Sequence, residues 1–260
     1  MPEVTKYPAG TPSWVDLASP DVDRSLDFYG QLLGWTFDEG SPETGGYRMA
    51  RKGGKSVAGV APLMEGQPPA WTTYISVDDA DKTAAAVGEA GGQVLMEPMD
   101  VMNFGRMAIF MDPTGAAIAV WQPRDHIGSE LVNEPGAVVW NELATRDADA
   151  AKEFYSAVFG WNWTLMSPDG DAYWLFLVGE RTTGGLMPMV GDMWPPEIPS
   201  HWMVYFDVDD ADAAAAKVTE LGGSVTVPPT DIPPGRFAVV NDPSGAVFSI
   251  IAVTQPDPAP

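Results

Sequence analysis

One phrase of the sequence is written twice, and this repeat limits the possible folds more than any other feature. A shift of 126 residues aligns Trp14 with Trp140, and a shift of 131 residues aligns residues 71–94 with residues 202–225. Self-similarity at a fixed offset indicates a duplicated structural unit. We therefore expect two domains joined by a linker. The predicted parts are a first domain at 11–122, a linker at 123–136 and a second domain at 137–253.

Each predicted domain divides into two modules with the same order of elements. A strand over Ser13–Ala18 precedes a helix that Asp21 caps and Gly34 ends, and β-favouring runs follow. The same order recurs from Thr72, with an Ala-rich helix. Mixed strands with helices on one face indicate the α+β class. The chain is therefore predicted to contain four βαβββ modules, at about 11–66, 70–122, 137–192 and 200–253.

Charge and composition exclude several classes of partner. The chain has 14 Lys and Arg against 36 Asp and Glu, which gives a formal net charge of −22. Such a field repels nucleic acid and anionic lipid surfaces, so we expect neither as a partner. No apolar run approaches the roughly 20 residues that cross a bilayer, and no export signal is visible, so we expect a cytoplasmic protein. Cysteine is absent, which excludes disulfides and thiolate chemistry.

Four stretches together resemble a known superfamily. They are SPDVDRSLDFYGQLLGW, TRDADAAKEFYSAVFGW, DPTGAAIAVWQ and DPSGAVFSII. These stretches are similar to the vicinal oxygen chelate superfamily, which contains glyoxalase I, extradiol dioxygenases and bleomycin resistance proteins. The resemblance implies two glyoxalase-like domains, each with a mixed β-sheet that curves into a U-shaped cup.

The resemblance also implies where a metal would bind. Metal-dependent members hold a divalent ion in the cup with His, Gln or Glu from the first and last strands of both modules. The matching positions in this chain are Trp14, approximately Gly59, Thr72 and Ala119, and then Trp140, approximately Gly185, Met203 and Ser249. None of these is an imidazole or a carboxylate, and a divalent cation needs several such donors within about 2.0 to 2.6 Å. We therefore expect neither a metal nor another cofactor.

A carboxylate accompanies each of the two tryptophans. Side chains two residues apart on a strand share a face, so Asp16 should lie beside Trp14, and Glu142 beside Trp140. A carboxylate partly removed from water has a raised pKa and can act as a general acid or base. Asp16 and Glu142 are therefore the candidate catalytic residues. The alternative is that each pairs with a buried arginine, the candidates being Arg48, Arg106, Arg146 and Arg236.

Aromatic side chains suggest what the cups bind. Tryptophans lie at several strand ends, where aromatic walls suit a planar or hydrophobic ligand. The predicted ligand-binding residues are Trp14, Trp71, Thr72, Trp140, Trp202, Met203 and Ser249. The alternative is that the large rings only fill the core. The two histidines, His126 and His201, are predicted to be loop residues rather than a metal site.

Several functions remain open at this stage. The first is metal-independent binding of a small hydrophobic or aromatic molecule, as in antibiotic sequestration or resistance. The second is a cofactor-independent tailoring enzyme of isomerase, cyclase or lyase type that uses Asp16 or Glu142 as general acid or base. A metal-dependent glyoxalase, hydroxylase or dioxygenase is the third. We expect a small organic molecule as partner, a monomer or weak homodimer, and the second cup as the functional one. The sequence does not decide whether catalysis occurs.

Overall fold

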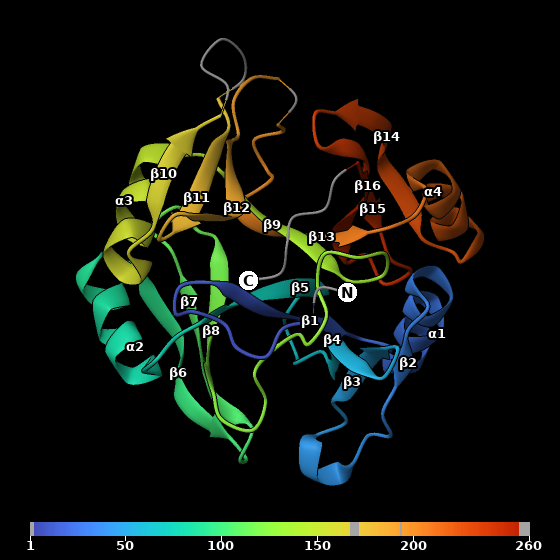
Figure 1. The fold of residues 1–260 in the computed structure, drawn as a ribbon, viewed down its shortest axis with the longest axis horizontal. Coiled ribbons are helices and arrows are strands. Elements are labelled where there is room, and N and C mark those ends of the chain that lie inside the picture. The colour runs from blue at the N-terminus through green and yellow to red at the C-terminus, as the bar shows by residue number, and fades with distance from the viewer. Residues whose placement is uncertain (1–2, 167–171, 193, 255–260) are drawn as a thin grey trace.

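The computed structural model describes residues 3–166, 172–192 and 194–254, which form two similar halves (Figure 1). The elements of the first half are β1 (Pro12–Ser19), α1 (Val22–Leu33), β2 (Thr36–Phe37), η1 (Pro42–Thr44), β3 (Arg48–Lys52), β4 (Lys55–Pro62), β5 (Ala70–Ser76), α2 (Ala80–Glu89), β6 (Gln93–Val101), β7 (Gly105–Met111) and β8 (Ala117–Pro123). Those of the second half are β9 (Val138–Thr145), α3 (Ala148–Phe159), β10 (Asn162–Leu165), β11 (Trp174–Val178), β12 (Arg181–Pro188), β13 (His201–Asp207), α4 (Ala211–Glu220), β14 (Ser224–Ile232), β15 (Gly235–Asn241) and β16 (Val247–Val253).

Each half forms one mixed sheet from both of its modules. The strand order is β2-β3-β4-β1-β5-β8-β7-β6 in the first half and β10-β11-β12-β9-β13-β16-β15-β14 in the second. Strands β1 and β4 run parallel, as do β5 and β8, whereas β1 and β5 are antiparallel and join the two modules. The prediction of an α+β fold with two glyoxalase-like repeats is therefore confirmed.

The helices begin and end where the sequence predicts. Asp21 accepts a hydrogen bond from the backbone N–H of Arg24 and so caps α1, and Gly34 ends this helix with a φ of 72°, a left-handed conformation that favours glycine. Asp147 and Gly160 do the same for α3. No helix in the described part of the chain is long and apolar enough to cross a membrane.

The two sheets lie with their helix-bearing faces toward each other. Helix α1 packs against α4 and α2 packs against α3, so each helix pair joins the two halves (Figure 1). One core cluster combines Leu17 and Phe28 of the first half with Phe206 and Phe248 of the second. Near the centre, Thr73 Oγ1 donates to Asn141 Oδ1 at 2.8 Å, and both side chains are buried. The other face of each sheet is therefore turned away from this shared core.

Two hydrogen-bonded chains of aromatic side chains cross the contact between the halves. In one, Trp71 Nε1 donates to Tyr29 Oη at 3.0 Å, and Tyr29 donates to Asp242 Oδ2 at 3.2 Å. In the other, Trp202 Nε1 donates to Tyr155 Oη at 2.9 Å, and Tyr155 donates to Asp112 Oδ2 at 2.9 Å. Asp112 and Asp242 also accept backbone N–H groups of their own DP-G turns. Each chain thus ties a helix of one half to a strand turn of the other.

The second of these chains yields a test of the contact between the halves. We expect Tyr155→Phe to lower the free energy of unfolding by about 1 to 3 kcal/mol, because it leaves the indole of Trp202 and the carboxylate of Asp112 with a missing partner inside the core. Urea unfolding measures the change. Val225→Thr, at an exposed position of β14, is the control and should shift stability by less than about 0.5 kcal/mol. An equal effect of both substitutions would contradict this account.

Candidate functional site

The face of each sheet that points away from the helices carries the candidate site. The strand register places the residues of the first half in two neighbouring rows. In one row, Asp16 of β1 lies between Gly59 of β4 and Thr72 of β5. In the other row, Tyr74 of β5 lies between Trp14 of β1 and Ala119 of β8. The same rows recur around Glu142 and Trp140. Cup 1 is defined by Trp14, Asp16, Tyr47, Gly59, Thr72, Tyr74 and Ala119. Cup 2 is defined by Trp140, Glu142, Tyr173, Gly185, Met203, Tyr205 and Ser249.

In cup 1, a tryptophan and two tyrosines surround the carboxylate. Trp14 Nε1 donates to Tyr47 Oη at 2.9 Å, and Tyr47 Oη donates to Asp16 Oδ2 at 3.5 Å. Tyr74 Oη donates to the same Asp16 oxygen at 2.9 Å. The site therefore offers a carboxyl group held by two phenolic donors.

Cup 2 repeats this arrangement with a glutamate. Trp140 Nε1 donates to Tyr173 Oη at 2.9 Å, and Tyr173 donates to Glu142 Oε2 at 2.7 Å. Tyr205 donates to the other oxygen, Oε1, at 2.9 Å. The Glu142 side chain is buried, with 5% of its surface exposed.

Burial changes the acidity of both carboxyl groups. Loss of water around Asp16 raises its pKa to about 7, although the hydrogen bonds from Tyr74 and Tyr47 act in the opposite direction. Burial also raises the pKa of Glu142, again opposed by its two tyrosines. Desolvation raises the pKa of Tyr47 and Tyr74 well above 10, so both phenols keep their protons. Asp16 can therefore gain and lose a proton near neutral pH, as a general acid or base requires.

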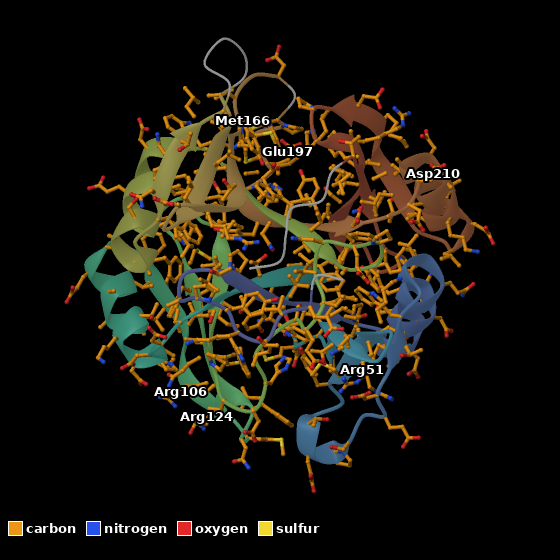
Figure 2. All side chains as sticks on the ribbon, viewed as in Figure 1. Arg51, Arg106, Arg124, Met166, Glu197 and Asp210 are labelled. Atoms are coloured by element: carbon orange, nitrogen blue, oxygen red, sulfur yellow. The ribbon has the colours of Figure 1, made fainter. Side chains whose placement is uncertain are left out.

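The arginines that were the alternative partners lie elsewhere. Arg106 pairs with Asp81 and Asp100 on the outside of the first half, near the β6–β7 hairpin (Figure 2). Arg236 makes the matching pairs in the second half, and Arg48 donates to a backbone carbonyl. Among the described residues, no ion pair includes Asp16 or Glu142. Tyrosines rather than arginines therefore hold the two carboxyl groups.

The residues at the implied metal positions do not fit a divalent cation. The indole N–H of Trp14 is a donor that is already bound to Tyr47, and an indole N–H cannot coordinate a metal. A Cβ atom added at Gly59 would overlap the hydroxyl of Tyr47, and one at Gly185 would overlap that of Tyr173, so a phenol fills the place of a ligand side chain. The described residues contain no group of three His, Cys, Asp or Glu side chains that could hold a metal.

The structure separates the predicted ligand-binding residues into two sets. Trp14, Thr72, Trp140, Met203 and Ser249 lie on the cup faces, as the register shows. Trp71 and Trp202 do not, because they alternate with Thr72 and Met203 along β5 and β13 and so point into the shared core, where they bind Tyr29 and Tyr155. The prediction that these two line a cup is wrong for this reason.

Sequence reasoning missed the four tyrosines of the cups. Tyr47 and Tyr173 obey the same shift of 126 residues that aligns the two tryptophans, and Tyr74 and Tyr205 obey the shift of 131. This repeated placement was a signal available in the sequence. The contact with the carboxylates could not be read from it, because Tyr47 is 31 residues from Asp16.

Of the two histidines, His126 contacts a residue of cup 1. Its ring packs edge-on against Trp14, with ring centroids 4.6 Å apart, and its carbonyl oxygen accepts a hydrogen bond from Trp121 Nε1 at 2.8 Å. Burial lowers the pKa of His126 to about 4, so the imidazole is neutral at pH 7. His201 begins β13 and its Nδ1 lies 2.8 Å from the carbonyl of Pro199. The linker thus covers the indole of Trp14.

The loop before β13 is anchored to the second half. The guanidinium of Arg146 donates to the carbonyls of Met189, Trp194, Pro195 and Ile198. The position of Arg146 in the first half is taken by Pro20, and the matching loop there is shorter. Arg146 is therefore a structural residue of this loop and not a partner of Glu142.

Comparison with known proteins shows the family to which the chain belongs. The model of the Glyoxalase/Bleomycin resistance protein/Dioxygenase superfamily matches residues 11–120 and 131–250. A putative glyoxylase, CFP32, of Mycobacterium tuberculosis is 46% identical over 96% of this chain and 98% of the relative. The anthracycline biosynthesis protein DnrV of Streptomyces peucetius is 40% identical, with 98% of each chain covered.

Solved structures show the same fold at low sequence identity. The Mn(II)-bound glyoxalase of Novosphingobium aromaticivorans has a TM-score of 0.66 and 18% identity, with 95% of this chain and 83% of that chain covered. The 2,3-dioxygenase LapB of Pseudomonas sp. KL28 has a TM-score of 0.66 and 14% identity, with 97% and 95% covered. At this level of identity, the similarity shows a shared fold and nothing further.

The raised pKa of Asp16 predicts how stability depends on pH. The folded-state pKa of about 7 exceeds the ordinary aspartate pKa of 3.8, so the folded protein binds this proton more tightly than the unfolded chain. The stabilisation is complete below about pH 4 and is lost as the pH rises through 7. Its upper bound is on the order of 4 kcal/mol.

The test compares wild type with Asp16→Asn, which keeps an oxygen for the two tyrosines but cannot ionise. Between pH 4 and 7, the free energy of unfolding should fall more steeply in wild type than in the variant. Asp207, whose pKa burial raises to about 6, is present in both proteins and cancels from the difference. Identical pH profiles for the two proteins would show that Asp16 has an ordinary pKa.

Proposed function

Because the chain belongs to the glyoxalase/bleomycin resistance protein/dioxygenase superfamily, we propose that it binds a small aromatic or hydrophobic molecule in a cup without using a metal ion. The observation that carries this proposal is the Trp–Tyr–carboxyl chain, which takes the place of metal ligands in both cups. Members of the superfamily bind small-molecule substrates on this fold, so the cup is the natural site. Antibiotic sequestration is one form that such binding takes.

A second function, a cofactor-independent tailoring enzyme, is favoured by one specific observation. The pKa of Asp16 lies at about 7, where a carboxyl group can take a proton from one position of a ligand and return it to another. Such an isomerisation needs no oxidant, reductant or cofactor. The relative from Streptomyces peucetius is named an anthracycline biosynthesis protein, which supports an aromatic biosynthetic intermediate as the molecule concerned.

The organisation of the chain supports a monomer or weak homodimer. Both modules of each sheet come from one half, and the two halves share a continuous core. Each cup is therefore complete within one chain, and no second copy is needed to build it.

Metal independence is tested on protein that carries no histidine tag. We expect elemental analysis to find less than stoichiometric manganese, iron, zinc and nickel, because the cups lack a set of metal donors. Prolonged treatment with a chelator should leave the affinity for an aromatic probe unchanged. Tightly bound metal at one ion per chain, together with loss of binding on its removal, would overturn this part of the proposal.

Substitution of the carboxyl groups separates a binding protein from an enzyme. Native mass spectrometry of protein from its own cells first identifies the molecule that it carries. If this molecule is turned over, Asp16→Asn or Glu142→Gln should lower kcat by about 10²- to 10⁴-fold, the range for a lost general acid or base. In either function the same substitutions should weaken binding by no more than about tenfold. Unchanged turnover in both variants would exclude the enzymatic function described here.

A further inference from the structure

We propose that cup 1 is the binding cup, in which Asp16 Oδ1 accepts a hydrogen bond from the hydroxyl group of an uncharged aromatic molecule, and that cup 2 is a structural copy. This inference rests on the function proposed above and specifies the site and the ligand class. It assigns the ligand to cup 1, whereas the sequence favoured the second cup as the functional one.

The two carboxyl groups differ in how their oxygens are used. In cup 1, Tyr47 and Tyr74 both donate to Oδ2 of Asp16, and Oδ1 has no hydrogen-bond partner in the described part of the chain. This oxygen is also not among the buried unpartnered side-chain atoms there, so it is not fully enclosed by the protein. In cup 2, Tyr173 and Tyr205 donate to different oxygens of Glu142. Only Asp16 therefore keeps an oxygen free to accept from a ligand.

The exposure of the two carboxyl side chains also favours cup 1. Asp16 is partly exposed, whereas Glu142 has 5% of its surface exposed. Part of the Asp16 surface is therefore open to contact by a ligand. Glu142 is buried and each of its oxygens already accepts a tyrosine hydroxyl, so a ligand could contact it only if the surrounding side chains moved.

The wall beside cup 1 suits a flat apolar molecule. On the β6–β7 hairpin, Met99 lies opposite Met107, and Met107 packs in the same cluster as Trp14. Met99 is 47% exposed and Phe104, at the hairpin end, is 43% exposed. Methionine side chains adapt their shape to the surface of a ligand, and exposed apolar side chains grouped at one place are typical of a binding site.

The second half lacks the methionine pair of this wall. The pair that corresponds to Met99 and Met107 is Thr230 and Phe237, and the hairpin end carries Asp231, Pro233 and Pro234. The two cups therefore share the carboxyl group and its tyrosines but differ in the surface that a ligand would touch.

Charge and hydrogen bonding define the ligand class. The groups that face Asp16 are phenols and an indole, and no ion pair of the described residues includes Asp16. An anionic ligand would meet a carboxylate without a compensating cation on a chain of net charge −22. When Asp16 is ionised, its free Oδ1 needs a hydrogen-bond donor, and the apolar wall is complementary to an apolar ring system. An aromatic molecule with a hydroxyl group meets both requirements.

Methionine-methyl NMR of the full chain locates the binding cup. The probes are 2-naphthol and, as the anionic counterpart, 2-naphthoate, at about pH 8, where Asp16 is ionised. With 2-naphthol, the methyl signals of Met49 and Met107 should shift, and that of Met203 in cup 2 should not. Single Met→Leu variants assign the signals.

The matched variants Asp16→Asn and Glu142→Gln test the role of Oδ1. An asparagine that gives its oxygen to the two tyrosines turns an N–H₂ group toward the cup. Asp16→Asn should therefore weaken the binding of 2-naphthol by about tenfold and strengthen the binding of 2-naphthoate, whereas Glu142→Gln should change neither affinity by more than about twofold. Reversal of the preference between the two probes cannot arise from simple loss of folding.

The outcomes separate this inference from the function on which it rests. Binding that shifts Met203 but not Met49 and Met107, or that responds to Glu142→Gln but not to Asp16→Asn, would overturn the choice of cup and leave aromatic binding intact. No shift with either probe, together with no bound molecule in native mass spectrometry, would overturn the proposed function as well.

Discussion

The interaction on which the structure depends is a short chain in which an indole N–H donates to a phenol and the phenol donates to a carboxyl group. It occurs four times in the part of the chain that the structure describes. Two copies lie in the shared core, from Trp71 through Tyr29 to Asp242 and from Trp202 through Tyr155 to Asp112. The other two hold Asp16 and Glu142 in the cups. In each chain the indole N–H and the phenol O–H both have an acceptor, which is the condition for keeping such groups in a core.

The same chemistry serves two purposes because a strand has two faces. Along β5, Trp71 and Thr73 point into the core, whereas Thr72 and Tyr74 point into cup 1. The core copies end on turns of the opposite half and so fix how the halves meet. The cup copies end on a carboxyl group on the opposite face of each sheet, where Asp16 is partly exposed and Glu142 is buried. The surroundings of a Trp–Tyr–carboxyl chain, rather than its residue types, therefore decide whether it joins the two halves or forms a site for a ligand.

Much of the fold could be predicted because its signals are local. The Asp cap and Gly end of α1 and the DP-G turns follow from neighbouring residues, and the repeat relates the two halves. The sites were harder, because they depend on contacts between distant strands. Tyr47, which lies over Gly59, is the residue before β3, and His126 contacts Trp14 from 112 positions away in the sequence. The wrong prediction that Trp71 lines a cup could have been avoided from the sequence alone, since Trp71 alternates with Thr72 along the strand and therefore lies on the opposite face.

The central claim is that the Asp16 carboxyl, held by two phenols beside the positions where the family resemblance implies metal ligands, keeps its proton up to about neutral pH. Infrared difference spectroscopy across a pH titration observes this proton directly. The account predicts a protonated-carboxyl band that is present at about pH 5.5, disappears with a midpoint near 7 and is absent from Asp16→Asn. The contradicting result is the same carboxyl spectrum from wild type and the variant over the whole titration, which would mean that Asp16 is ionised throughout.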